Sequence, residues 1–210
     1  MNTRQYRRRL PGLMAAMVIG ASTVFVMSTP AFAALGYTLT LWRGDNVASV
    51  NTSNMAVTVC DQERDGNGVF GQFVTTSGTV TKIGDPTGSG IGCGNETVAS
   101  TTYRFRVCED SSTGCSSYGQ WNSSKAAVFY GASWASYIKS SNQFEVCDTV
   151  EDGHGILGTF VGSGGTVTVS DPNGSKAGCG LVSGWVPGHF KVCENTGPDI
   201  LCSSWLYINF

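Results

Sequence analysis

An internal repeat dominates this sequence and restricts what the chain can fold into. Short motifs recur in the same order in its two halves. The matched pairs are V-C-D at 59–61 and 146–148, D-G-x-G at 65–68 and 152–155, G-T-V-T at 78–81 and 165–168, C-G at 93–94 and 179–180, F-x-V-C-E at 105–109 and 190–194, and C-S-S at 115–117 and 202–204. So many matches in one order indicate a tandem duplication. We therefore predict two copies of one domain, at residues 34–121 and 122–210.

Residues 1–33 have the pattern of a secretory signal peptide. Four arginines lie within the first nine residues, an apolar run follows at 13–27, and Ala31-Phe32-Ala33 is a small-x-small cleavage site. The alternative is a membrane anchor, but polar residues interrupt the apolar run, which is short for a span. We expect cleavage after Ala33 and a secreted, extracellular protein.

Removing the signal peptide makes the chain acidic. The whole sequence has 13 Lys and Arg against 15 Asp and Glu, and residues 1–33 hold four of the basic residues and none of the acidic ones. The mature chain therefore has 9 basic and 15 acidic residues, a net charge of −6. Nucleic acid and anionic membranes attract basic surfaces, so we expect neither as a partner.

All eight cysteines lie in the mature chain, and an even number in an exported protein indicates disulfides. They are Cys60, Cys93, Cys108, Cys115, Cys147, Cys179, Cys193 and Cys202. No two of these cysteines have the C-x-x-C spacing that would indicate zinc ligation. Three pairings are possible in each domain. Pairing of neighbours predicts Cys60–Cys93, Cys108–Cys115, Cys147–Cys179 and Cys193–Cys202.

The local patterns predict an all-β fold. Residues 103–108 alternate apolar and polar side chains, as do 144–147 and 189–193, which is typical of half-buried strands. The D-G-x-G motifs predict hairpin turns, and no helical periodicity of useful length is present. We expect two tandem, small, disulfide-stapled β-sandwich domains, either immunoglobulin-like or barrel-like.

No residue pattern indicates catalysis. Only two histidines occur, His154 and His189, and the first domain has Asn67 and Arg104 in their places. Neither lies beside a nucleophile motif. We predict no catalytic residue and no cofactor.

One loop resembles half of a calcium site. Asp61, Glu63 and Asp65 have the spacing of the first ligands of an EF-hand, but position twelve is Gln72 and the second domain has Val150 in the middle. A turn rich in Asp and Gly explains the same residues. We predict no metal site.

The start of the mature chain is a candidate partner-binding segment. Leu35, Tyr37, Leu39, Leu41 and Trp42 give it apolar side chains on both faces, and it is free to extend if nothing precedes it. An apolar arm of this kind can add a strand to a partner or fill a groove. The alternative is an ordinary first strand of the sandwich.

Five tryptophans occur in the chain, at positions 42, 121, 134, 185 and 205. Core packing is the simpler explanation for them. Exposed tryptophans side by side would instead indicate binding to sugar or to protein.

The combined pattern of V-C-D-x-x-x-D-G-x-G, C-G, F-x-V-C-E and C-S-S-[YW] resembles small exported proteins of filamentous actinobacteria. Among these it resembles the adaptor subunit of the umbrella toxin particles. That family implies an adaptor that links a large polymorphic toxin subunit to lectin-bearing subunits, without catalysis or cofactor. It also makes the N-terminal segment a candidate docking element.

We therefore expect a non-enzymatic secreted interaction protein, an adaptor in an extracellular antibacterial toxin complex whose partners are other secreted proteins. Two alternatives stay open. One is a secreted hydrolase inhibitor, and the other is a carbohydrate-binding module.

Overall fold

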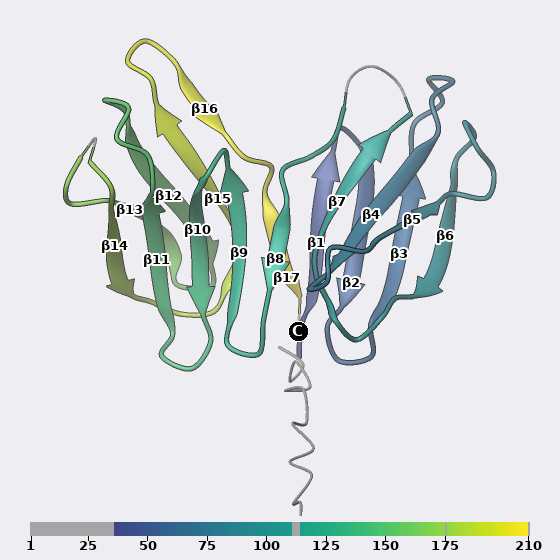
Figure 1. Ribbon diagram of the computed structural model, residues 1–210, viewed down its shortest axis with the longest axis horizontal. Coiled ribbons are helices and arrows are strands. Elements are labelled where there is room, and N and C mark those ends of the chain that lie inside the picture. The colour runs from purple at the N-terminus through teal and green to yellow at the C-terminus, as the bar shows by residue number, and fades with distance from the viewer. Residues whose placement is uncertain (1–35, 111–113, 175, 210) are drawn as a thin grey trace, which may run out of the picture.

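The computed structural model describes residues 36–110, 114–174 and 176–209, so the predicted signal peptide lies outside the described residues (Figure 1). Within this part the chain forms seventeen strands and no helix, which confirms the predicted all-β class. None of the described residues forms a helix with the length and hydrophobicity to cross a membrane.

Each repeat contributes its strands in the same order. The first repeat forms β1 (Thr38–Arg43), β2 (Asn46–Asn51), β3 (Ala56–Asp61), β4 (Val69–Thr75), β5 (Val80–Gly84), β6 (Gly92–Thr97), β7 (Thr102–Glu109) and β8 (Gly119–Trp121). The second forms β9 (Lys125–Tyr130), β10 (Ser133–Ile138), β11 (Gln143–Asp148), β12 (Gly155–Gly162), β13 (Gly165–Ser170), β14 (Gly178–Ser183), β15 (Pro187–Asn195), β16 (Ile200–Cys202) and β17 (Leu206–Asn209). The boundary placed at residue 121 falls between β8 and β9.

The two sheets run through both repeats. The nine-stranded sheet A has the order β13-β12-β15-β17-β1-β2-β3-β6, with β16 beside β15. The eight-stranded sheet B has the order β14-β11-β10-β9-β8-β7-β4-β5. Each sheet thus takes about half of its strands from each repeat. Figure 1 shows the two repeats as neighbouring two-layer lobes that meet at β1, β8, β9 and β17.

Two antiparallel pairings join the lobes. In sheet A, β1 pairs with β17, with Leu39 opposite Ile208 and Leu41 opposite Leu206. In sheet B, β8 pairs with β9 across the turn that links the repeats. Because β1 and β17 lie at opposite ends of the described chain, the fold closes only when both ends are in place.

The core lies between the sheets. Buried aromatic rings stack across neighbouring strands, Phe73 on Phe105 and Phe160 on Phe190. A glycine in the same place of each repeat lets the sheets approach closely. A Cβ atom on Gly158 would collide with Val146 of the opposite sheet, and the matching Gly71 is equally crowded. This contact explains why the repeats share that glycine.

Four disulfides fasten neighbouring strands, in the pairing predicted from the sequence. They are Cys60–Cys93, Cys108–Cys115, Cys147–Cys179 and Cys193–Cys202. Two of them join the third strand of a repeat to its sixth, the outermost strand of that half-sheet. The described residues include no free cysteine.

Candidate functional site

The predicted N-terminal arm is an inner strand of sheet A. β1 is hydrogen-bonded to β17 on one edge and to β2 on the other. The expectation that this segment is free to extend is therefore wrong, because both of its edges are already paired. The geometry is that of the alternative considered, an ordinary strand of the sandwich.

The side chains of this segment differ in what they can contact. Leu39 and Leu41 are fully buried and Tyr37 is 8% exposed, so all three pack within the chain. Trp42 is 36% exposed on the outer face of sheet A, and Leu35 lies outside the described residues. A role in partner binding stays a prediction, and Trp42 is the described residue of this set that is placed to have one.

Trp42 belongs to a row of aromatic side chains across the junction in sheet A. The row, named here strip A, consists of Trp42, His189, Lys191, Trp205 and Tyr207. The pairing of β1 with β17 reaches Leu41 opposite Leu206, and Trp42 and Trp205 are the next residues beyond that pair. The His189 ring lies 4.8 Å from that of Trp205 and 4.9 Å from that of Tyr207, and the Lys191 ammonium is 4.7 Å from the Trp205 ring centre.

Strip A carries little charge. Burial between two aromatic rings lowers the pKa of His189, because the charged imidazolium is poorly solvated there. Lys191 is then the one permanent cation of the strip. The strip is a row of contacting aromatic rings, of the kind that packs on an apolar or ring-shaped partner surface.

A second row, strip B, crosses the other junction on the outer face of sheet B. It consists of Tyr118, Phe129 and Trp134 with the cations Arg104, Arg106 and Lys125. The Phe129 amide donates a hydrogen bond to the Tyr118 carbonyl, and Phe129 lies opposite Trp134 on β10. The three rings therefore come from adjacent strands in one line.

Cations cover both ends of strip B. The guanidinium groups of Arg104 and Arg106 lie 4.8 and 4.5 Å from the Tyr118 ring centre. The Lys125 ammonium lies 4.2 Å from the Trp134 ring and 2.7 Å from a Glu145 carboxylate oxygen. A shallow pocket of about 270 Å³ opens beside Lys125 and Trp134. Its lining consists of Gln120, Asn122, Lys125, Ala127, Phe129 and Trp134.

The duplication relates the two strips but has changed their chemistry. Trp205 follows the second C-S-S motif as Tyr118 follows the first, and the F-x-V-C-E motif places His189 where the first repeat has Arg104. One outer face therefore presents neutral aromatic rings, and the other presents aromatic rings among cations. The sequence alone did not bring these residues together, because each strip combines strands from both repeats.

The tryptophans divide between the core and the outer faces. Trp121 is buried, and Trp185 packs edge-on against Phe144 of the core. Trp42, Trp134 and Trp205 lie on the outer faces in the two strips. Core packing thus explains two of the five, and the strips account for the others.

The loop that resembles a calcium site is held by turn hydrogen bonds. Asp61 accepts one from the Glu63 amide, Asp65 accepts one from the Asn67 amide, and Glu63 accepts one from the Asp45 amide. The three carboxylates thus act separately in capping backbone groups. The turn explanation accounts for them.

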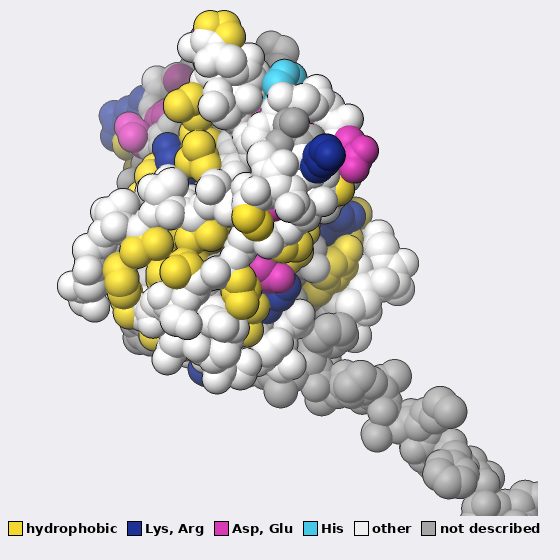
Figure 2. Space-filling model, turned by 90° about the vertical axis from the view of Figure 1, so that its left-hand side faces the viewer, with side chains coloured by type: hydrophobic (Ala, Val, Ile, Leu, Met, Phe, Trp, Pro, Cys, Tyr) yellow, Lys and Arg dark blue, Asp and Glu magenta, His cyan; other side chains and the backbone are white. Residues whose placement is uncertain are grey.

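The outer edge of the second repeat is more apolar than that of the first. Leu181 and Val182 are exposed on the edge strand β14, where β6 has Asn95 and Glu96. Figure 2 views this end of the molecule and shows hydrophobic side chains spread over it, with a few charged side chains among them. An apolar edge of this kind can accept an added strand from another chain.

No protein-family model, curated protein or solved structure matches this chain. The geometry of its own residues is therefore what any functional proposal has to build on.

Proposed function

We propose that the protein is a non-enzymatic secreted interaction protein that holds two partners at once, one on each outer face. In its specific form it is an adaptor between a polymorphic toxin subunit and lectin-bearing subunits of an extracellular antibacterial complex. The observation that carries the proposal is the pair of aromatic strips, which lie on different faces and differ in charge.

The composition of the strips favours protein partners. Tryptophan, tyrosine and arginine are the residues that most often dominate the binding energy of protein interfaces. Strip B combines two arginines with a tyrosine, and its cations stand out on a chain whose mature charge is −6. It suits an acidic partner surface, whereas strip A suits an apolar one. Two different faces are what an adaptor requires.

The disulfides support an extracellular setting. Four bridges persist only where the surroundings are oxidising, as they are outside the cell. They also keep both faces rigid, which lowers the entropy lost when a partner binds.

A matched pair of variants tests the adaptor role. Trp205→Ala and Tyr118→Ala remove the aromatic ring at matching positions of the two repeats. The first alters strip A and the second alters strip B. Tagged protein is recovered from culture supernatant, and co-purifying proteins are identified by mass spectrometry. We expect each variant to lose a different partner and to keep the other. Loss of the same partner by both folded variants, or of no partner by either, would contradict the proposal.

A second candidate function is carbohydrate binding by strip A. Trp42 and Trp205 follow the last paired residues of β1 and β17 and are both partly exposed, and with Tyr207 they offer aromatic surface on which a sugar ring can stack. Intrinsic tryptophan fluorescence during titration with soluble polysaccharides tests it. A change that disappears in Trp42→Ala and persists in Tyr118→Ala would favour this function over the adaptor.

A further inference from the structure

A set of acidic side chains lies at one end of each repeat, where β7 and β15 finish at the top of Figure 1. The two sets match in sequence. Asp65 and Glu109 of the first repeat correspond to Asp152 and Glu194 of the second. Their surroundings differ in a way that decides what each end can bind.

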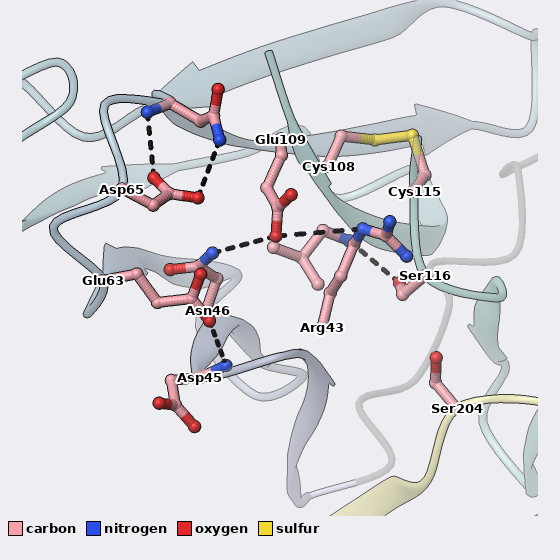
Figure 3. A network of polar contacts seen from close by, with 12 residues as sticks. Arg43, Asp45, Asn46, Glu63, Asp65, Cys108, Glu109, Cys115, Ser116 and Ser204 are labelled. Carbon is pink, nitrogen blue, oxygen red and sulfur yellow. Dashed lines mark hydrogen bonds and ion pairs between the residues drawn. A yellow bond between two sulfur atoms is a disulfide. The ribbon is translucent and has the colours of Figure 1, made fainter. Parts of the chain in front are cut away.

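In the first repeat these carboxylates are satisfied by neighbouring side chains of the chain itself (Figure 3). The Asn46 amide donates a hydrogen bond of 3.1 Å to Glu109, and the Arg43 guanidinium lies 3.9 Å from the same oxygen. Asn67 donates to both oxygens of Asp65, from its backbone and from its side chain. Two asparagines thus donate hydrogen bonds to these carboxylates, and Arg43 brings a positive charge to Glu109.

The second repeat has lost those donors. The L-W-R-G-D-N segment at 41–46 becomes V-F-Y-G-A-S at 128–133, so Tyr130 replaces the arginine and Ser133 replaces Asn46. His154 takes the place of Asn67. Its Nδ1 atom lies 3.7 Å from a carboxylate oxygen of Asp152 and 4.0 Å from one of Glu194. One ligand atom from each of these three residues lies within 4.8 Å of the other two.

A buried carboxylate at the same end has one oxygen without a hydrogen-bond partner among the described residues. Asp148 ends β11 and is 3% exposed. It continues the inward-facing series of Phe144 and Val146, so its carboxylate points into the space between the sheets, as that of Glu194 does from β15. One Asp148 oxygen accepts hydrogen bonds from Ser133 and from the backbone, whereas Oδ2 has no hydrogen-bond partner among the described residues.

A second buried carboxylate lies at the same end. Asp171 is 4% exposed, and its amide donates to the Ile156 carbonyl, next to the start of β12. Its Oδ2 atom also lacks a hydrogen-bond partner among the described residues. In the first repeat the Asp61 oxygen is likewise without one, but there Arg43 brings a positive charge to the cluster. Among the described residues of the second repeat, no lysine or arginine lies within ion-pair distance of this cluster.

Burial raises the pKa of Glu194, the neighbouring Asp152 and Asp148 raise it further, and His154 partly opposes this. The cluster borders an open hollow of about 540 Å³ lined by His154 and by glycines on the neighbouring turns. A cation can reach it directly from solvent.

We propose that Asp152, His154 and Glu194 bind a divalent transition-metal ion, with Zn²⁺ the best fit. One imidazole and two carboxylates are ligands that zinc accepts, at about 2.0–2.2 Å. Small movements of these side chains would bring the three atoms to those distances. An imidazole ligand disfavours calcium and magnesium, which take oxygen ligands. Asp148 strengthens the site through its charge, and the solvent side of the ion stays open to a further ligand.

The direct test is calorimetric titration of the secreted protein, without a polyhistidine tag, with Zn²⁺ in metal-free buffer. We expect one ion per chain. His154→Asn installs the first repeat's residue, and we expect it to weaken binding by more than about tenfold. Glu109→Gln changes the matching carboxylate of the first repeat and should leave the affinity unchanged.

A double variant tests the reason for the difference between the repeats. Tyr130→Arg with Ser133→Asn restores the two donors that the second repeat lacks, and we expect it to abolish Zn²⁺ binding. Melting curves in EDTA establish that every variant is folded. Failure of the folded native chain to bind Zn²⁺, equal binding by His154→Asn, or selective Ca²⁺ binding that His154→Asn leaves intact would each overturn the proposal.

Discussion

The two repeats share their strands, disulfides and core glycines, yet the matching carboxylates at one end of each repeat have different neighbours. The first repeat places Arg43 and Asn46 against Glu109, whereas the second leaves Glu194 beside His154 with no added cation among the described residues. The outer faces show the same divergence, because strip B has arginines where strip A has His189 and Lys191. The duplication has thus preserved the framework and changed the surfaces, which is where binding properties can vary without loss of the fold.

The largest effect is expected from removing β1, the strand that joins the two repeats in sheet A. Deletion of residues 36–43 takes away β1, with the fully buried Leu39 and Leu41, and leaves β2 and β17 with unpaired inner edges. We expect loss of the cooperative fold in both repeats, measured by circular dichroism and limited proteolysis. Trp42→Ala is the control, because it alters the outer face only and should fold normally. A truncated chain with a native melting transition would contradict the role of β1 in joining the two repeats.

The pairing of β1 from the first repeat with β17 from the second could not be predicted from the sequence. β8 and β17 occupy the same place in their repeats, so the motif pattern fits β1 pairing with either of them. Packing of whole sheets, and not local sequence, selects β17. The all-β class and the disulfide pairing were predictable, because alternation and cysteine order are local properties.

The candidate sites were less predictable for a related reason. His154 lies in the turn just before β12 and Glu194 lies on β15, forty residues later, and the pairing of β12 with β15 brings them together. Sequence comparison of the repeats did identify His154 as a departure from Asn67. The missing information was that Tyr130 and Ser133 face the same end of the sandwich.

A smaller effect is expected from removing one disulfide of each repeat in turn. Cys60–Cys93 and Cys147–Cys179 close loops of nearly equal length, with separations of 33 and 32 residues. The chain-entropy model assigns about 3–4 kcal/mol to each, and we expect paired Cys→Ala variants to lose similar amounts of unfolding free energy. Denaturant titration measures both. A titration of either variant that resolves two transitions would show that the repeats unfold as separate units and not as one body.

The smallest expected effect concerns the charges at the two ends, and it differs in sign between the repeats. The pKa of Glu194 is raised above its ordinary value of 4.5 by burial and by neighbouring carboxylates, so the folded protein holds this proton more tightly than the unfolded chain does. Stability from this group is present at pH below 4.5 and is lost as the pH rises through the raised value. Glu194→Gln removes that loss, and in metal-free buffer it should raise the melting temperature at pH 7 and have little effect at pH 4.

Glu109→Gln instead removes a partly exposed ion pair with Arg43, so it should lower stability at pH 7 by up to about 1 kcal/mol. Melting curves of both variants at the two pH values give the comparison. If both substitutions shift stability in the same direction at pH 7, the two ends do not differ in charge balance as the structure indicates.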